Sequence, residues 1–104
     1  MGQASREKPA RLGVKLLQIR TALGLSQNGM VERLGLAIPQ FMISNFERGT
    51  REPSLIVLLK YARVVRVAVE VLIDDELDLP EQLAIHRLFM GSEAARLPSK
   101  KQKG

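Results

Sequence analysis

The segment from Ser26 to Gly49 carries two short helical patterns in quick succession, and it constrains the fold more than any other part of the chain. Ser26 suits an N-cap, because its hydroxyl can accept a hydrogen bond from an amide in the first helical turn. Gly35 follows the first pattern and Gly49 follows the second, and glycine readily takes the left-handed conformation that ends a helix. The apolar positions of the two patterns are Met30, Val31 and Leu34, then Met42, Ile43 and Phe46. Two helices joined by a tight turn are therefore expected here.

Four segments in order, around and within this region, resemble the Cro/lambda-repressor-like helix-turn-helix domain of the xenobiotic-response-element family of transcriptional regulators. They are LGLSQ (23–27), ERLG (32–35), ISNFERG (43–49) and REPSL with LLKYA (51–62). The resemblance spans Arg11 to Leu79. It implies an all-α, five- or six-helix lambda-repressor-like DNA-binding domain with a central helix-turn-helix.

Hydrophobic periodicity places the other helices. Leucine and isoleucine recur at helical spacing from Leu12 to Leu23, which predicts a first helix that Gly24 ends. Gly13 should weaken its first turn. The recognition helix is expected from about Pro39 to Arg48, because proline is tolerated at a helix start. A fourth helix should open at Pro53-Ser54. Its expected core-facing stripe is Leu55, Leu58, Leu59 and Ala62.

The stretch from Val64 to Ile73 gives conflicting signals. Its β-branched residues alternate with other residues in the manner of a strand, yet the chain offers no second strand for pairing. The resemblance implies instead that the fourth helix ends near Arg66 and that a short fifth helix runs from about Ala68 to Ile73. We follow the resemblance.

Composition and charge narrow the class of protein. The chain of 104 residues is 45% hydrophobic, which suits one small domain with a packed core. Its net charge is +5, but residues 1–66 hold eleven basic against four acidic side chains, whereas residues 67–104 hold five against seven. The basic part coincides with the helix-turn-helix, where a polyanion would bind. With no membrane-spanning run and no apolar signal core, a cytoplasmic, nucleoid-associated protein is expected.

The chain divides into four parts on this interpretation. Residues 1–10 form a flexible N-terminal arm, 11–79 the DNA-binding domain, 80–97 a C-terminal helix, and 98–104 a disordered basic tail. The basic residues Arg6, Lys8 and Arg11 could contact phosphates, although a frayed terminus is the alternative. Residues 74–81 hold five carboxylates without the spacing of a cation loop, and they indicate an acidic loop facing away from DNA.

Three features depart from the family pattern, and one of them is Val31 in the second helix, where the family usually has a small alanine. Gly29 lies within the second helix, where the family usually has a charged helix former, and this should cost about 1 kcal/mol relative to alanine. The turn before the recognition helix is also longer: seven residues, 36–42, stand where the family usually has about five. Pro39 lies within this turn and pushes Ile38 towards an extended conformation. The longer turn means that the sequence does not determine the angle of the recognition helix in the major groove of DNA.

The resemblance assigns roles to individual residues. Base contacts in the major groove fall to Gln40, Phe41, Ser44 and Asn45. Glutamine and asparagine can each make paired hydrogen bonds to adenine, whereas Phe41 could pack on a thymine methyl group or fill the core. Phosphate contacts fall to Ser26, Gln27, Arg48, Thr50 and Arg51. Arg20 and Glu47 match positions that form a structural pair in many family members.

The sequence does not indicate a metal-binding protein or an enzyme. The chain has no cysteine and one histidine, His86, so no metal site is expected there. No nucleophile–base ordering or phosphate-binding glycine loop is present, and we predict neither an enzyme nor a cofactor.

We therefore expect a sequence-specific transcriptional regulator that binds double-stranded DNA and acts as a repressor. It is expected to bind as a homodimer, without membrane attachment and with a possible protein partner. An antitoxin or a phage-type repressor would both fit. The alternative is a protein-interaction module, of coactivator-bridging or antitoxin type, that reuses the helix-turn-helix fold.

Overall fold

The computed structural model describes residues 8–81 and residue 83. Within this part the chain forms five helices and no strand, which confirms the predicted all-α fold. Most of the predicted helix over 80–97, the tail over 98–104 and most of the N-terminal arm lie outside the described residues. The helices are α1 (Leu12–Leu23), α2 (Gln27–Leu34), α3 (Gln40–Arg48), α4 (Leu55–Val65) and α5 (Val69–Ile73).

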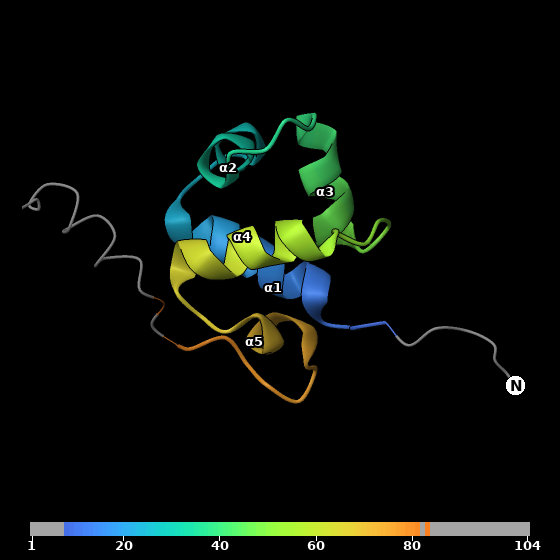
Figure 1. Ribbon diagram of the computed structural model, residues 1–104, viewed down its shortest axis with the longest axis vertical. Coiled ribbons are helices and arrows are strands. Elements are labelled where there is room, and N and C mark those ends of the chain that lie inside the picture. Colours follow the sequence, from blue (N-terminus) through green and yellow to red (C-terminus); the bar gives the residue numbers. More distant parts are fainter. Residues whose placement is uncertain (1–7, 82, 84–104) are drawn as a thin grey trace, which may run out of the picture.

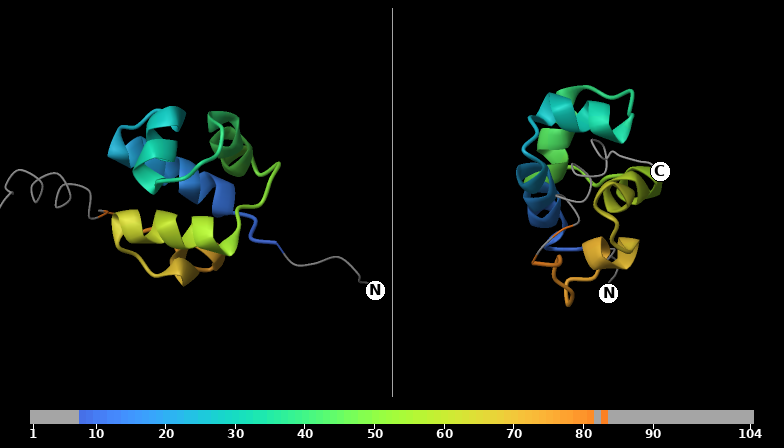
Figure 2. Two further views of the ribbon diagram at one scale, coloured as in Figure 1. Left: turned by 45° about the horizontal axis from the view of Figure 1, so that its top comes forward. Right: turned by 90° about the vertical axis from the view of Figure 1, so that its left-hand side faces the viewer.

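The helices are arranged so that α2 and α3 lie at one end of the domain and α5 lies at the other (Figures 1 and 2). Between them, α1 and α4 cross the middle, and α1 packs against α3, α4 and α5. The acidic stretch after α5 lies at the end of the domain opposite the helix-turn-helix. The acidic loop and the helix-turn-helix therefore occupy opposite ends of the domain, while the basic residues Arg11 and Lys15 lie beside the acidic loop.

Local sequence signals set the helix boundaries. Gly24, Gly35 and Gly49 all have positive φ angles and end α1, α2 and α3 in turn. Pro39 is the N-cap of α3 in an extended conformation, so the recognition helix begins one residue later than Pro39 itself. The Pro39 carbonyl oxygen accepts a hydrogen bond from the Met42 amide at 3.0 Å.

The conflicting stretch from Val64 to Ile73 is helical on both sides of a break. Arg66 takes a left-handed conformation (φ 60°) and separates α4 from α5. The strand interpretation is wrong, because no neighbouring strand exists in the described part of the chain to pair with the backbone amides and carbonyls.

The core faces of the helices meet around Tyr61, whose side chain is fully buried. The predicted stripe of α4 is wrong at Leu55, which is 81% exposed because the first turn projects beyond the edge of the core. The buried side of α4 lies further round the helix and consists of Val57, Leu58, Tyr61, Ala62 and Val65.

Gly13 marks the closest approach of α1 to α3. A Cβ atom built at this position would lie 2.6 Å from the Glu47 carbonyl oxygen and 3.0 Å from that of Phe46. Such distances are too short for carbon and oxygen, so glycine is required for the two helices to meet. The prediction that Gly13 only weakens the first turn therefore missed its main role.

Replacing Gly13 by alanine should destabilise the domain, although alanine is the better helix former by about 1 kcal/mol. We expect a net loss of about 1–3 kcal/mol, because the clash involves backbone that can yield only if α1 and α3 move apart. Urea denaturation of the full chain measures the change. Gly29→Ala is the matched control, since the atoms nearest to a Cβ atom there belong to the side chains of Ser26 and Leu25 and not to backbone of another helix. Equal effects of the two substitutions would contradict the close-approach argument.

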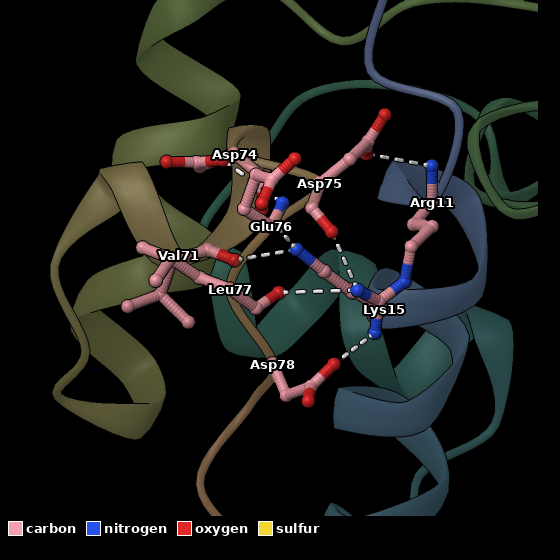
Figure 3. A network of polar contacts seen from close by, with 8 residues as sticks. All are labelled: Arg11, Lys15, Val71, Asp74, Asp75, Glu76, Leu77 and Asp78. Atoms are coloured by element: carbon pink, nitrogen blue, oxygen red, sulfur yellow. Dashed lines mark hydrogen bonds and ion pairs between the residues drawn. The ribbon is translucent and has the colours of Figure 1, made fainter.

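The acidic loop after α5 caps the start of α1 (Figure 3). The N-cap of α1, Arg11, has no capping side chain of its own. Instead, the Asp75 carboxylate accepts from the backbone amides of Ala10 at 2.8 Å and Arg11 at 3.0 Å. The Arg11 guanidinium donates to the Asp75 carbonyl at 2.6 Å and pairs with Asp78. Arg11 is thus bound by the acidic loop, on the side away from α2 and α3, and is not placed to contact phosphate.

These contacts make the stability of the domain depend on pH. The backbone amides of Arg11 and Ala10 lower the pKa of Asp75, and the hydrogen bond from Arg11 lowers the pKa of Asp78. A depressed folded-state pKa stabilises the native state above the unfolded pKa of about 3.9, and this contribution is lost as the pH falls below it. We expect the double variant Asp75→Asn, Asp78→Asn to melt below the wild type at pH 7, with the difference shrinking below about pH 4. A difference in melting temperature that does not vary with pH would contradict the assignment.

Candidate nucleic-acid interface

The start of α2 presents backbone amides to solvent. Ser26 is its N-cap, and the Ser26 hydroxyl oxygen accepts from the Gly29 amide at 2.9 Å. Gly29 therefore lies in the first turn of α2, where its amide serves the cap, and not in the middle of the helix as expected. The backbone amides of Gln27 and Asn28 donate no hydrogen bond to any of the described residues. A helix start with open amides and a positive dipole end can bind a phosphate.

The exposed edge of α3 begins at its first residue. Gln40 and Phe41 are both exposed, and the Phe41 side chain is 59% exposed. The alternative in which Phe41 fills the core is therefore excluded. Ser44 lies one turn later and is half-buried, while Ile43 and Phe46 hold the opposite side of α3 in the core. Three of the predicted base-contact residues thus follow one another along an accessible face.

Asn45 connects the predicted base-contact and phosphate-contact residues. Its side-chain oxygen accepts from the Arg48 guanidinium at 2.8 Å and from the Thr50 hydroxyl at 3.3 Å. Its backbone carbonyl accepts from the amides of Thr50 and Arg51 at 3.0 and 3.3 Å. Asn45 is half-buried, whereas these three partners are exposed. The loop after α3 is therefore folded back onto its last turn, with its hydrogen-bond donors gathered at one place.

A surface hollow of about 460 Å³ lies beside this loop. Its lining includes Arg48, Thr50 and Arg51 from one side and Lys8 from the chain before α1. Three cationic residues therefore border the same hollow, together with the acidic residues Glu47, which is paired with Arg20, and Glu52.

Arg20 and Glu47 join α1 to α3 in a two-pronged ion pair. Arg20 donates from Nε to one Glu47 oxygen at 2.6 Å and from a terminal nitrogen to the other at 3.0 Å. Its remaining terminal nitrogen donates to the Leu25 carbonyl at 3.0 Å. The Glu47 side chain is only 5% exposed and that of Arg20 is 19% exposed. Hydrogen bonding to Glu47 raises the pKa of Arg20, so the pair stays charged.

Two side chains near the pair lie inward. Gln27 is half-buried, and its amide nitrogen lies 3.5 Å from a Glu47 oxygen, so its side chain faces the ion pair more than the solvent. The Tyr61 hydroxyl is buried without a hydrogen-bond partner within the described part. Burial, and then the charge of Glu47, raise the pKa of Tyr61, so its hydroxyl is neutral at physiological pH.

The sequence interpretation missed two residues that position this surface. Gly13 sets the distance between α1 and the end of α3. Lys15 is 1% exposed and anchors α1 to α5 on the opposite side. The signals were weak: a glycine in the first turn of a periodic helix, and a lysine three residues after the apolar Leu12.

Neither a metal centre nor a membrane segment emerges from the residues that the structure describes. No group of three or more histidine, aspartate or glutamate side chains in that part could hold a metal ion. None of its helices combines the length and the apolar character needed to cross a bilayer.

Comparisons with known proteins place this geometry in a family. A helix-turn-helix family model matches residues 16–72. Among solved structures, the restriction-modification controller protein C.AhdI from Aeromonas hydrophila is 33% identical with a TM-score of 0.50, over 58% of this chain and 88% of that one. A chain of the SinR–SinI protein complex is 28% identical with a TM-score of 0.56, over 88% of this chain and 85% of that one. No curated protein matches the sequence.

The family model covers α2, α3 and α4 completely and most of α1 and α5. It therefore matches the elements that bear the exposed edge of α3 and the open start of α2. The model spans more than half of the chain, and the chain accordingly belongs to the helix-turn-helix family of Cro/C1-type, DNA-binding transcriptional regulators.

Proposed function

We propose that this protein binds double-stranded DNA sequence-specifically and represses transcription. The observation that carries the proposal is the exposed edge of α3, in which Gln40 and Phe41 are accessible and lead to the hydrogen-bonded group around Asn45. In this proposal α3 lies in the major groove, which is wide enough to admit a helix. The base-facing residues are Gln40, Phe41, Ser44 and Asn45.

The side chains at the start of α3 supply most of the base recognition. The Gln40 amide offers a donor and an acceptor, the pair that adenine presents in the major groove. Phe41 offers an apolar surface to a thymine methyl group. The side-chain oxygen of Asn45 is already bonded to Arg48 and Thr50, so Asn45 contacts a base through its amide donor and holds its two partners in place.

Phosphate contacts frame the recognition helix on both sides. The amides at the start of α2, beside Ser26 and Gln27, face one phosphate. Arg48, Thr50 and Arg51 contact another near the end of α3, where Lys8 borders the same hollow. Contacts on both sides of the helix would fix its register without reading sequence.

A homodimer in the cytoplasm, associated with the nucleoid, completes the proposal. One recognition helix covers only a few base pairs, and two copies related by a two-fold axis supply the specificity of a longer site. One similar structure is a complex of SinR with SinI, which supports a protein partner as a second mode of control here.

Selection of bound duplexes from a random pool tests the proposal directly, because it yields the preferred motif and the spacing of its half-sites. On the selected site, Gln40→Ala should cost about 1–3 kcal/mol of binding free energy and relax the preference at one position. Arg51→Ala should weaken binding to all sequences and lower the slope of log K against log salt by about 1.

The matched control is Arg66→Gln, which removes an exposed cation at the far end of α4 and should leave DNA binding unchanged. A flat salt dependence of the wild type, or no enriched motif, would contradict the proposal and favour the protein-interaction module instead.

A further inference from the structure

The first two residues of α3 place one polar and one aromatic side chain at a projecting end of the domain. α3 begins at Gln40, and its start lies farther from α1 and α4 than its end does (Figure 1). Gln40 is exposed, and the Phe41 side chain is 59% exposed. A phenyl ring gains free energy when it leaves water. The N-terminal residues of a recognition helix are the ones that reach base edges, so Phe41 stands where a base would cover it.

The long turn before α3 holds this phenyl ring in a fixed place. Leu36 and Ile38 are partly buried and pack against the core, so the turn is anchored to the domain. Pro39 has a restricted φ angle and is the N-cap of α3. Met42, the residue after Phe41, also packs against the core. The backbone on both sides of Phe41 is therefore bound to the domain, while its side chain remains exposed.

The same stretch lacks the side chains that most often read guanine. Arginine and lysine make the commonest specific contact to that base, and the sequence has neither between Arg33 and Arg48. Arg48, at the end of α3, already donates to the Asn45 side-chain oxygen at 2.8 Å. The start of α3 is therefore left with two kinds of reader, the Gln40 amide and the apolar surface of Phe41.

We propose that Phe41 makes binding depend on the methyl group at C5 of a pyrimidine base. In the major groove this methyl group is the apolar feature that distinguishes one base pair from another. Thymine carries it and so does 5-methylcytosine, whereas uracil and unmodified cytosine do not. The inference rests on the proposed function, because it needs α3 in the major groove. It goes further by naming the chemical group that is read and a DNA modification to which binding responds.

The surroundings of Phe41 favour a base over a pocket in another protein. An aromatic anchor of a protein–protein interface is surrounded by contacts that exclude water. On α2 and α3, Phe41 is the only large apolar side chain that is exposed. Its neighbours along the exposed edge are the polar Gln40 and Ser44, and protein–DNA interfaces are more polar than protein–protein interfaces. A single apolar contact within a polar surface matches a methyl group in the major groove.

Removal of single methyl groups from DNA tests the proposal, with the full chain and the site selected from a random pool. Each thymine of the duplex is replaced in turn by uracil, which lacks only the C5 methyl group, and affinity is measured by fluorescence anisotropy. We expect one position in each half-site where uracil weakens binding about fourfold, the equivalent of about 0.8 kcal/mol for one carbon group leaving water. With a C·G pair at that position, methylation of the cytosine at C5 should strengthen binding by a similar factor.

Variants of the protein assign the methyl dependence to one side chain. Phe41→Ala should bind the thymine and uracil duplexes equally well, whereas Phe41→Leu keeps an apolar side chain and should retain a preference for thymine. Ile56→Ala is the matched control, because Ile56 is 60% exposed but belongs to α4. It should leave the ratio of the two affinities unchanged. Circular dichroism of each variant checks that the fold is kept.

Two results would overturn the inference: a selected site in which no thymine is sensitive to uracil, and a preference for thymine that persists in Phe41→Ala. A wild type that selects a motif but ignores methyl groups leaves the proposed function standing and removes this inference alone. If the wild type binds no duplex at all, the proposed function fails and this inference fails with it.

Discussion

Replacing Glu47 by alanine is expected to destabilise the domain by about 3–5 kcal/mol, because it leaves the Arg20 guanidinium without its counter-charge beneath the protein surface. The two hydrogen bonds from Arg20 to Glu47 also disappear, and with them a polar link between α1 and α3. A loss of this size removes a large part of the stability of a small domain. Urea denaturation followed by circular dichroism measures it.

Two further variants make the interpretation of Glu47→Ala specific. Glu47→Gln keeps the size and one acceptor of the side chain, so it should cost less than alanine. Glu32→Ala removes an exposed carboxylate from α2 and should change the unfolding free energy by no more than about 0.5 kcal/mol. If Glu47→Ala were as mild as Glu32→Ala, the ion pair would contribute little and the helices would be held by apolar packing alone.

Replacing Lys15 by methionine should cost about 2–4 kcal/mol, even though methionine is the more apolar residue for a buried site. The Lys15 ammonium donates to the carbonyls of Val71 at 2.8 Å and Asp74 at 2.9 Å (Figure 3). The side chain is 1% exposed. Methionine would fill its space but give up two hydrogen bonds from a charged donor, each worth about 1.5–3 kcal/mol. The Asp74 carbonyl would keep the Leu77 amide as a donor at 3.0 Å, whereas the Val71 carbonyl would lose the ammonium donor that holds α5 to α1.

Lys8→Met is the matched control for Lys15→Met, because Lys8 is exposed and its substitution removes the same charge. It should change the free energy of unfolding by about 0.5 kcal/mol or less, and the urea midpoint should therefore shift only slightly. Hydrogen exchange adds a local measurement. Relative to the wild type, Lys15→Met should speed the exchange of the α5 amides more than that of the α2 amides. Uniform loss of protection across all helices would contradict an anchoring role for Lys15.

The helix-turn-helix could be predicted because its signals are local. Ser26 and Gly35 determine where α2 begins and ends, and the apolar spacing of α1 gave both of its boundaries. Pro39 was expected to stand at the start of the recognition helix, and it is its N-cap. Such signals depend on residues within a turn or two of one another, so they can be recognised in the sequence.

The errors arose where the deciding contact is distant in the chain. Leu55 belongs to an apolar helical pattern, but its side chain is exposed because the core ends before it, and periodicity cannot show where a core ends. Gly13 is explained by the carbonyl oxygen of Glu47, and Lys15 by carbonyls near α5. The break near Arg66 was predicted correctly, but from the family resemblance and not from residue types, because a left-handed residue that is not glycine has no dependable signal in the sequence.

At the candidate interface, the sequence indicated which side chains belong to the surface but not how they are connected. Gln40 and Phe41 are accessible because α3 turns its apolar residues inward, as the pattern indicated. The bonds from Arg48 and Thr50 to Asn45 depend on the backbone after Gly49 folding back, and this path could not be deduced from residue types.

The bonds of Lys15 also bear on how the protein matures during translation. A ribosome adds residues in order, and the carbonyls that Lys15 requires belong to residues 71 and 74, more than fifty positions later. Until those residues leave the exit tunnel, a growing chain with all four preceding helices lacks the acceptors that hold Lys15 and the α5 segment that packs on α1. We therefore expect the nascent protein to stay incompletely folded, and sensitive to proteases, until synthesis has passed α5.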